Sequence, residues 1–166
     1  MSETMTRFIT GGQFLVEPIT EAKVYSREDF TEEHRDIYNM VMEFDRDRIL
    51  AQKEEIEKYN PDLIKSLIKE MGELGLLGID VPEEYGGLAL DKTTACIIVD
   101  ALSAGRNASI MTTASAHTGI SMLPIAWYGN HDQKKKYLSK LASGEWMGSY
   151  ALTESGAGSD ALSGTT

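Results

Sequence analysis

The feature that most constrains the fold of this chain is a series of helix-length apolar patterns, each bounded by a cap and a glycine. Asn60-Pro61 opens one of them, because asparagine can accept the free N–H groups of a first helical turn and proline fits that turn. Gly75 is a common type of helix stop. Between them, apolar residues recur at helical spacing: Leu63, Ile64, Leu67, Ile68, Met71 and Leu74.

Four further stretches carry similar signals. Helices are expected at about 29–58 with a break near 45–48, and at 91–104, 107–128 and 131–143. Asp91 is a candidate cap, as are Asn107 and Ser109 for the next helix. That next helix is rich in small residues, so we expect it to be central and buried, and Pro124 should kink or divide it. These patterns predict an all-α domain of about five to six helices over residues 29–144.

The two ends of the chain follow different patterns. Residues 1–28 show little periodicity and are interpreted as an N-terminal arm. In residues 145–153, Trp146, Gly148 and Tyr150 alternate onto one side, which predicts a strand. One strand cannot satisfy its own backbone, so we expect its partner strands beyond Thr166 or in another copy, and we expect the chain to be truncated.

A turn of glycine and small hydroxyl residues follows the predicted strand. Gly156 and Gly158 allow the backbone to approach a ligand closely, while Ser155, Ser159 and Thr153 supply hydroxyl groups. Successive N–H groups in such a turn can bind a phosphate. An ordinary strand-to-loop exit has the same composition, so the residues alone leave both interpretations open. The turn lacks the features of a Walker loop and of a Rossmann fingerprint.

Charge and cysteine content narrow the choice of partner and compartment. The net charge of -10 argues against nucleic acid or an anionic membrane as the main partner. The first ten residues lack signal-peptide character, and a single cysteine fits a reducing cytoplasm. We interpret Cys96, between Ala95 and Ile97, as a buried inert thiol, and His117 as a core histidine. No Cys/His cluster has metal-site spacing, so no metal is expected.

Three blocks of sequence, at 75–87, 133–145 and 150–160, resemble the acyl-CoA dehydrogenase family in the family's order. The similarity covers roughly residues 30–166. The arm from Gly11 to Glu17 resembles the very-long-chain branch more closely.

The resemblance implies a helical N-terminal domain over 29–144 and the first strand of a truncated β-barrel domain over 145–166. It implies an FAD-dependent oxidation of acyl-CoA thioesters to 2-enoyl-CoA in fatty-acid β-oxidation, with electron-transferring flavoprotein as acceptor. It places the catalytic glutamate in a C-terminal domain beyond Thr166, so this fragment alone is expected to be inactive. It also implies a homo-oligomer when full length.

Individual site residues follow from the same resemblance. Tyr150, Leu152 and Thr153 would lie against the flavin ring. Gly158 and Ser159 would approach the pyrophosphate, and Ser159 would also lie near the acyl-CoA.

Other residues of the loop and of the central helix have less direct roles. Glu154 and Asp160 are interpreted as structural, and Ser155 stands where relatives commonly have proline, which removes a fixed backbone angle. Met111 and Met122 are candidates for the lining of an acyl channel. Two alternatives remain at this stage: an acyl-CoA oxidase or other flavoenzyme of the superfamily, and a non-enzymatic helical interaction module.

Overall fold

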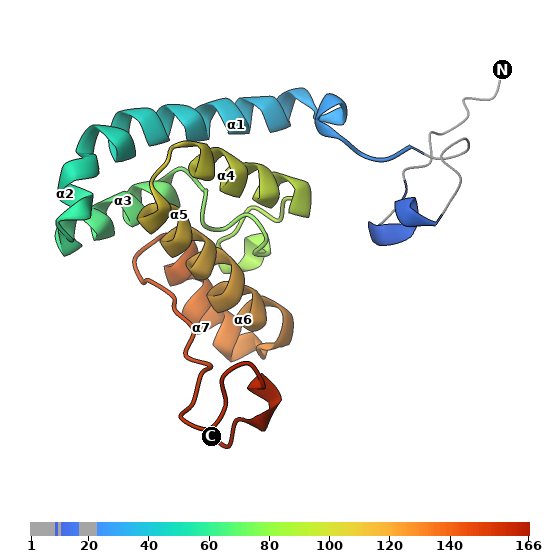
Figure 1. The fold of residues 1–166 in the computed structure, drawn as a ribbon, viewed down its shortest axis with the longest axis vertical. Coiled ribbons are helices and arrows are strands. Elements are labelled where there is room, and N and C mark those ends of the chain that lie inside the picture. The colour runs from blue at the N-terminus through green and yellow to red at the C-terminus, as the bar shows by residue number, and fades with distance from the viewer. Residues whose placement is uncertain (1–8, 10, 17–22) are drawn as a thin grey trace. The chain divides into compact units, whose positions relative to one another are not determined.

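The chain divides into two compact units, Met1–Asp36 and Ile37–Thr166 (Figure 1). A computed structural model describes residues 9, 11–16 and 23–166. The described part of the first unit contains the short 3-10 turns Gly11–Leu15 and Arg27–Asp29. Much of the predicted arm, including Glu17, lies outside the described residues, and the assignment of this arm stays a prediction.

The first long helix is interrupted where the sequence predicts a break. Helix α1 spans Glu32–Phe44, and the hydroxyl of Thr31 accepts the N–H of His34 at its start. A π-helical segment, Asp45–Ile49, and a 3-10 turn separate α1 from α2, which spans Lys53–Glu57. The break is therefore a change of helical register rather than an end.

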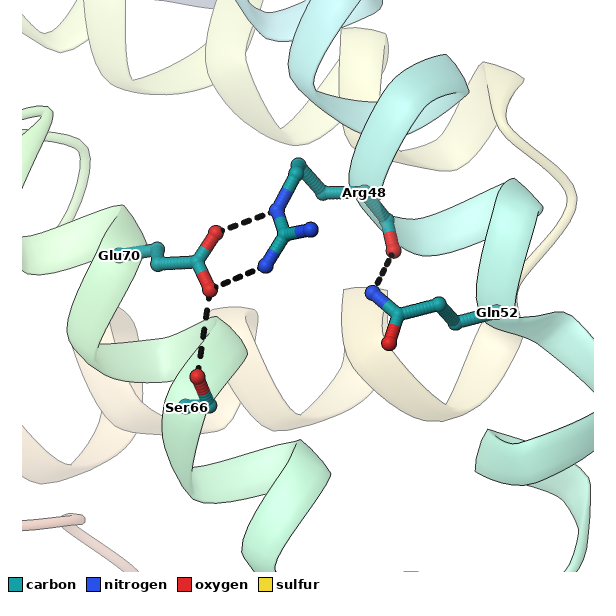
Figure 2. Close-up of polar contacts among 4 residues, drawn as sticks. All are labelled: Arg48, Gln52, Ser66 and Glu70. Atoms are coloured by element: carbon teal, nitrogen blue, oxygen red, sulfur yellow. Dashed lines mark hydrogen bonds and ion pairs between the residues drawn. The ribbon is translucent and has the colours of Figure 1, made fainter.

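An ion pair fixes this π-helical segment to α3. The Nε and Nη2 atoms of Arg48 each lie 2.6 Å from an oxygen of Glu70, so the pair is bidentate (Figure 2). Ser66 donates to the same carboxylate, and Gln52 donates to the backbone carbonyl of Arg48. These hydrogen bonds, with Arg48 the largest cause, lower the pKa of Glu70. Both side chains are partly exposed, so water screens the pair and its contribution to stability is small.

The remaining helices begin and end close to the predicted positions. They are α3 (Pro61–Glu73), α4 (Lys92–Ala104), α5 (Ala108–Ser115), α6 (Leu123–Tyr128) and α7 (His131–Ala142). The side chains of Asn60, Asp91 and Asn107 accept the N–H three residues on, at 2.8 to 3.2 Å. Gly75 and Gly144 follow α3 and α7 with positive φ angles of 76° and 71°, which favour glycine. The all-α prediction is confirmed.

The predicted helix 107–128 is divided, which agrees with the kink or division predicted from Pro124. A π-helical segment, Ala116–Met122, joins α5 to α6, and Pro124 lies in the first turn of α6. Proline has no N–H for the carbonyl four residues earlier, which favours a break just ahead of it. The π-helical segment packs against α7 as well as against its two neighbours in sequence.

Two apolar clusters hold these helices together. The larger joins α1, α3, α4, α5 and the loop after α3, with Val41, Leu67 and Ala101 completely buried. The smaller joins the end of the π-helical segment to α7 through Met122 and Leu138. No described helix is long and apolar enough to cross a membrane.

The segment that follows α7 contains no strand in the described chain. The predicted strand at 145–153 is irregular, and the segment's β-type pairing is an isolated bridge between Glu154 and Ala157. The strand prediction is therefore wrong for this chain. The alternating pattern is present, but no described segment offers a backbone with which it could pair. We call residues 145–166 the tail.

Candidate active site: an apolar cavity and a glycine loop

A cavity of about 520 Å³ opens beside α4 and is lined mostly by apolar side chains. Helix α4 contributes Ala95, Cys96, Val99 and Ser103, which cluster on one side of the helix because Val99 lies three or four residues from each of the others. The opposite wall comes from α5 and the π-helical segment Ala116–Met122. The floor comes from the loop after α3. The volume lies within the range of about 300–1,000 Å³ that small-molecule sites have in proteins.

Small side chains keep this cavity open. Helix α4 is anchored in the core by Ile97, Ile98 and Leu102, and Ile98 and Leu102 also border the cavity, while Cys96 and Ser103 on this helix are exposed. Across the cavity, a Cβ at Gly119 would meet nothing within 4 Å. The cavity therefore results from where small residues fall on two facing helices.

Cys96 is exposed in the structure and contributes to the cavity wall. The prediction of a buried thiol is wrong, because Cys96 lies on an exposed side of α4 while its neighbour Ile97 is buried in the core. The two methionines proposed for an acyl channel do not line this cavity either. Met111 packs against the larger core and Met122 is buried in the smaller one.

One edge of the cavity is charged. The ammonium group of Lys92 lies 2.7 Å from Asp80 Oδ1, and both residues contribute to the lining. The same group lies 5.8 Å from the centre of the Trp127 ring, which is within reach of a cation–π interaction. An apolar interior with charge at the edge suits a ligand that has a long apolar part and a polar end.

The residues predicted to contact a flavin lie in the tail. Tyr150 and Leu152 leave 54% and 48% of their surface exposed, and Thr153 and Ser159 are exposed as well. A Cβ at Gly156 or at Gly158 would meet nothing within 4 Å, so the backbone there is open to a ligand. The tail therefore presents aromatic, hydroxyl and glycine groups on one accessible segment.

Glu154 organises the tail from within. Its carboxylate accepts the N–H groups of Thr165 and Thr166 at 2.9 and 3.0 Å and the Thr165 hydroxyl at 3.2 Å. These hydrogen bonds, led by the one from the Thr165 backbone, lower the pKa of Glu154 to about 2. The geometry agrees with the structural role predicted for this residue.

His117 links the tail to the helices. It is 1% exposed, with Nε2 2.9 Å from the carbonyl oxygen of Leu141 and Nδ1 2.9 Å from the N–H of Gly148. The expectation of a core histidine is confirmed. Its contact with Gly148 joins residues 31 apart in sequence, and no sequence pattern indicated it.

Sequence reasoning also missed the cavity face of α4. Nothing in the sequence pattern of residues 91–104 showed that one side of the helix borders a cavity. The spacing of small residues on α4, opposite a segment equally rich in small residues, is the signal that was available.

Comparison with known proteins identifies the family. The model of the acyl-CoA dehydrogenase N-terminal domain matches residues 31–145. A probable acyl-CoA dehydrogenase of Bacillus subtilis is 47% identical over 94% of this chain. A mitochondrial isovaleryl-CoA dehydrogenase of Solanum tuberosum is 38% identical over 81% of it.

A solved structure agrees with these sequence matches. The crystal structure of an acyl-CoA dehydrogenase from Bacillus anthracis, complexed with FAD, has a TM-score of 0.87 and 47% identity over 94% of this chain. The chain spans 26% of that structure and of the Bacillus subtilis relative, and 32% of the Solanum protein. The chain belongs to the acyl-CoA dehydrogenase family, and it matches the N-terminal domain of that family.

Proposed function

We propose that the cavity beside α4 holds the acyl chain of an acyl-CoA thioester, in the N-terminal part of an FAD-dependent dehydrogenase. The observation that carries this proposal is the cavity itself: it has an apolar interior, small residues on both walls and charged groups at its edge. A fatty acyl chain is flexible and apolar, and a cavity of this kind binds it by excluding water from its surface.

The tail fits one side of an FAD site. Tyr150 and Leu152 offer exposed apolar surface to an isoalloxazine ring, and Thr153 offers a hydroxyl group. Gly158 and Ser159 offer an open backbone and a hydroxyl to the pyrophosphate, and Ser159 would also reach the acyl-CoA. FAD would supply the hydride acceptor, while these residues orient the ring and keep it near the acyl chain.

The wider assignments belong to the same proposal. Residues 1–28 form an arm, 29–144 the helical domain, and 145–166 the start of a β-barrel domain. The full-length protein forms 2-enoyl-CoA in fatty-acid β-oxidation, passes electrons to electron-transferring flavoprotein, and acts in the cytoplasm as a homo-oligomer. The catalytic base lies outside this chain, so residues 1–166 alone have no activity. The family match and the resemblance of the tail support these assignments.

A matched pair of substitutions tests the cavity. Cys96→Trp places a large ring at the cavity wall, whereas Ala104→Trp places the same ring on an exposed position of α4 outside the lining. In the full-length protein, we expect Cys96→Trp to weaken octanoyl-CoA binding at least about tenfold and Ala104→Trp to leave it unchanged. Calorimetric titration measures both. Equal affinities in the two variants would show that the cavity does not hold the acyl chain.

The electron acceptor is tested separately. Full-length protein with octanoyl-CoA is expected to reduce an artificial dye and to produce no hydrogen peroxide. Peroxide formation would assign the protein to the acyl-CoA oxidases instead. The 166-residue chain is expected to show neither flavin absorbance nor turnover, and turnover by that chain would contradict the proposed location of the catalytic base.

A further inference from the structure

The imidazole of His117 has a defined protonation state in this structure. The N–H of Gly148 donates to Nδ1, so Nδ1 must be unprotonated. The proton is then on Nε2, which donates to the carbonyl oxygen of Leu141 in α7. Burial, the largest cause, lowers the pKa of His117, and the carbonyl of Leu141 opposes that shift. The neutral imidazole therefore bridges α7 and the tail.

Gly148 also packs closely against Ser121, which lies with His117 in the π-helical segment Ala116–Met122. A Cβ on Gly148 would lie 1.8 Å from the hydroxyl oxygen of Ser121 and 2.8 Å from its Cβ. Ser121 and His117 are four residues apart, so the close approach of Ser121 and the hydrogen bond to His117 both act on the backbone of Gly148. The π-helical segment also borders the cavity through Thr118 and Gly119. One segment thus contacts both parts of the proposed site.

Few backbone hydrogen bonds hold residues 146–153 of the tail. The N–H of Trp146 donates to the carbonyl of Lys140, and the next backbone pairing is the bridge at Glu154. Between Trp146 and Glu154, in the described part of the chain, Gly148 is the one residue whose backbone N–H donates a hydrogen bond, and its acceptor is His117. Tyr150, Leu152 and Thr153 lie in this interval, so their placement depends on Gly148.

We propose that His117 is the positioning residue of the flavin-facing segment: its Nδ1 holds Gly148 and thereby fixes the position of Tyr150 to Thr153. The link to flavin in this inference rests on the proposed function. The placement of residues 148–153 by His117 rests on the geometry alone.

Two substitutions at His117 each keep one of the two hydrogen bonds of the imidazole and remove the other. In His117→Asn, the amide oxygen lies close to the position of Nδ1 and can still accept the N–H of Gly148. In His117→Gln, the amide nitrogen lies close to the position of Nε2 and can still donate to Leu141. Each variant loses one buried hydrogen bond, so a purely structural role for His117 predicts similar effects of the two.

The first measurement does not require flavin. Hydrogen exchange of the full-length apoprotein is followed by mass spectrometry in peptides that cover residues 146–153 and, as a reference, α3. We expect exchange in 146–153 to be about tenfold faster in His117→Gln than in His117→Asn, with α3 unchanged. Equal exchange in the two variants would overturn the placement.

The second measurement is the dissociation constant of FAD. We expect the Gln variant to bind FAD about tenfold more weakly than the Asn variant. Equal FAD affinity despite different exchange would overturn the role in flavin binding and leave the placement intact. A wild-type protein that binds no FAD would refute the proposed function, and the exchange experiment would still decide the placement.

A third variant covers the case in which a substitution at His117 prevents folding. Gly148→Ala leaves the imidazole intact and displaces the loop through Ser121. It should accelerate exchange in 146–153 and weaken FAD binding while α3 stays protected. Unchanged exchange in this variant would contradict the inference.

Discussion

The helices and the tail of the second unit differ in what gives them order. In the helices, Leu67, Ile68 and Met71 are completely buried, and close packing fixes each of them from several sides. In the tail, Ala157 is the buried apolar residue, while Leu162 is 99% exposed. Polar contacts order the tail instead, namely those made by His117 and by Glu154. The two parts of the proposed site therefore depend on different forces.

This difference separates the effects that substitutions should have. A change in the helices should alter the free energy of unfolding of the whole unit, because the packed side chains lose their contacts together. A change in the tail should alter local order and ligand binding, with little change in the unfolding free energy. Four predictions test this contrast, from the largest expected effect to the smallest.

Gly72→Ala should cause a large loss of stability. A Cβ at Gly72 would lie 2.2 Å from the carbonyl oxygen of Ser143, so α3 and the end of α7 would have to separate. We expect a loss of about 3 kcal/mol in chemical denaturation, since backbone atoms cannot move aside as a flexible side chain can. Gly156→Ala in the tail is the matched control, because a Cβ there meets nothing within 4 Å. Similar losses of stability in the two variants would contradict the difference between the helices and the tail.

Leu138→Ala compares two leucines at opposite extremes of burial. Leu138 is completely buried in the smaller core, and its truncation should cost about 3 kcal/mol through lost contacts and a residual cavity. Leu162→Ala removes the same atoms from the exposed tail and should change stability by less than about 0.5 kcal/mol. Thermal unfolding of the two variants measures the difference. A large effect at Leu162 would show that the tail packs more firmly than the structure indicates.

The same contrast explains what the sequence predicted correctly. Caps such as Asn60 and Asp91 act on a backbone group three residues away, so a local pattern is enough to find them. The apolar face of α3 likewise depends only on helical spacing. The helices and their boundaries were therefore predictable from short windows of sequence.

Features that depend on distant contacts were missed or assigned wrongly. The alternation in residues 145–153 is local, but a strand requires a partner that the described chain does not provide. Cys96 has apolar neighbours in sequence, but its exposure depends on which face of α4 the core covers. Pro124 signalled a break in the helix at 107–128, but the contact of His117 with Gly148 depends on tertiary packing and left no local signal.

Asp45→Asn tests the cost of burying a carboxylate among the helices. Asp45 is 1% exposed, its Oδ1 has no hydrogen-bond partner in the described structure, and burial raises its pKa. A raised pKa in the folded state means that stability is complete below 3.8, the unfolded value, and falls as pH rises through the folded pKa.

Because asparagine stays neutral, Asp45→Asn should be more stable than the wild type by about 1 kcal/mol at pH 7. The advantage should disappear below pH 3.8, where aspartate is protonated in both states. Denaturation at several pH values measures both effects. A pH-independent difference would show that charge burial is not its cause, and Asp47→Asn, at an exposed position of the same segment, is the control.

Glu154→Gln should have the smallest effect on the unit and a clear effect on the tail. In the folded state the pKa of Glu154 is lowered to about 2 from its usual 4.5, so the order that its carboxylate provides is complete above pH 4.5 and is lost as pH falls toward 2. Glutamine has one oxygen instead of two, so it cannot accept the N–H groups of both Thr165 and Thr166 as the carboxylate does. We expect faster amide exchange at these two threonines at neutral pH and an unchanged midpoint of thermal unfolding. If the midpoint falls together with the protection, the tail and the helices unfold as one cooperative unit, and the separation between packing and polar contacts does not hold.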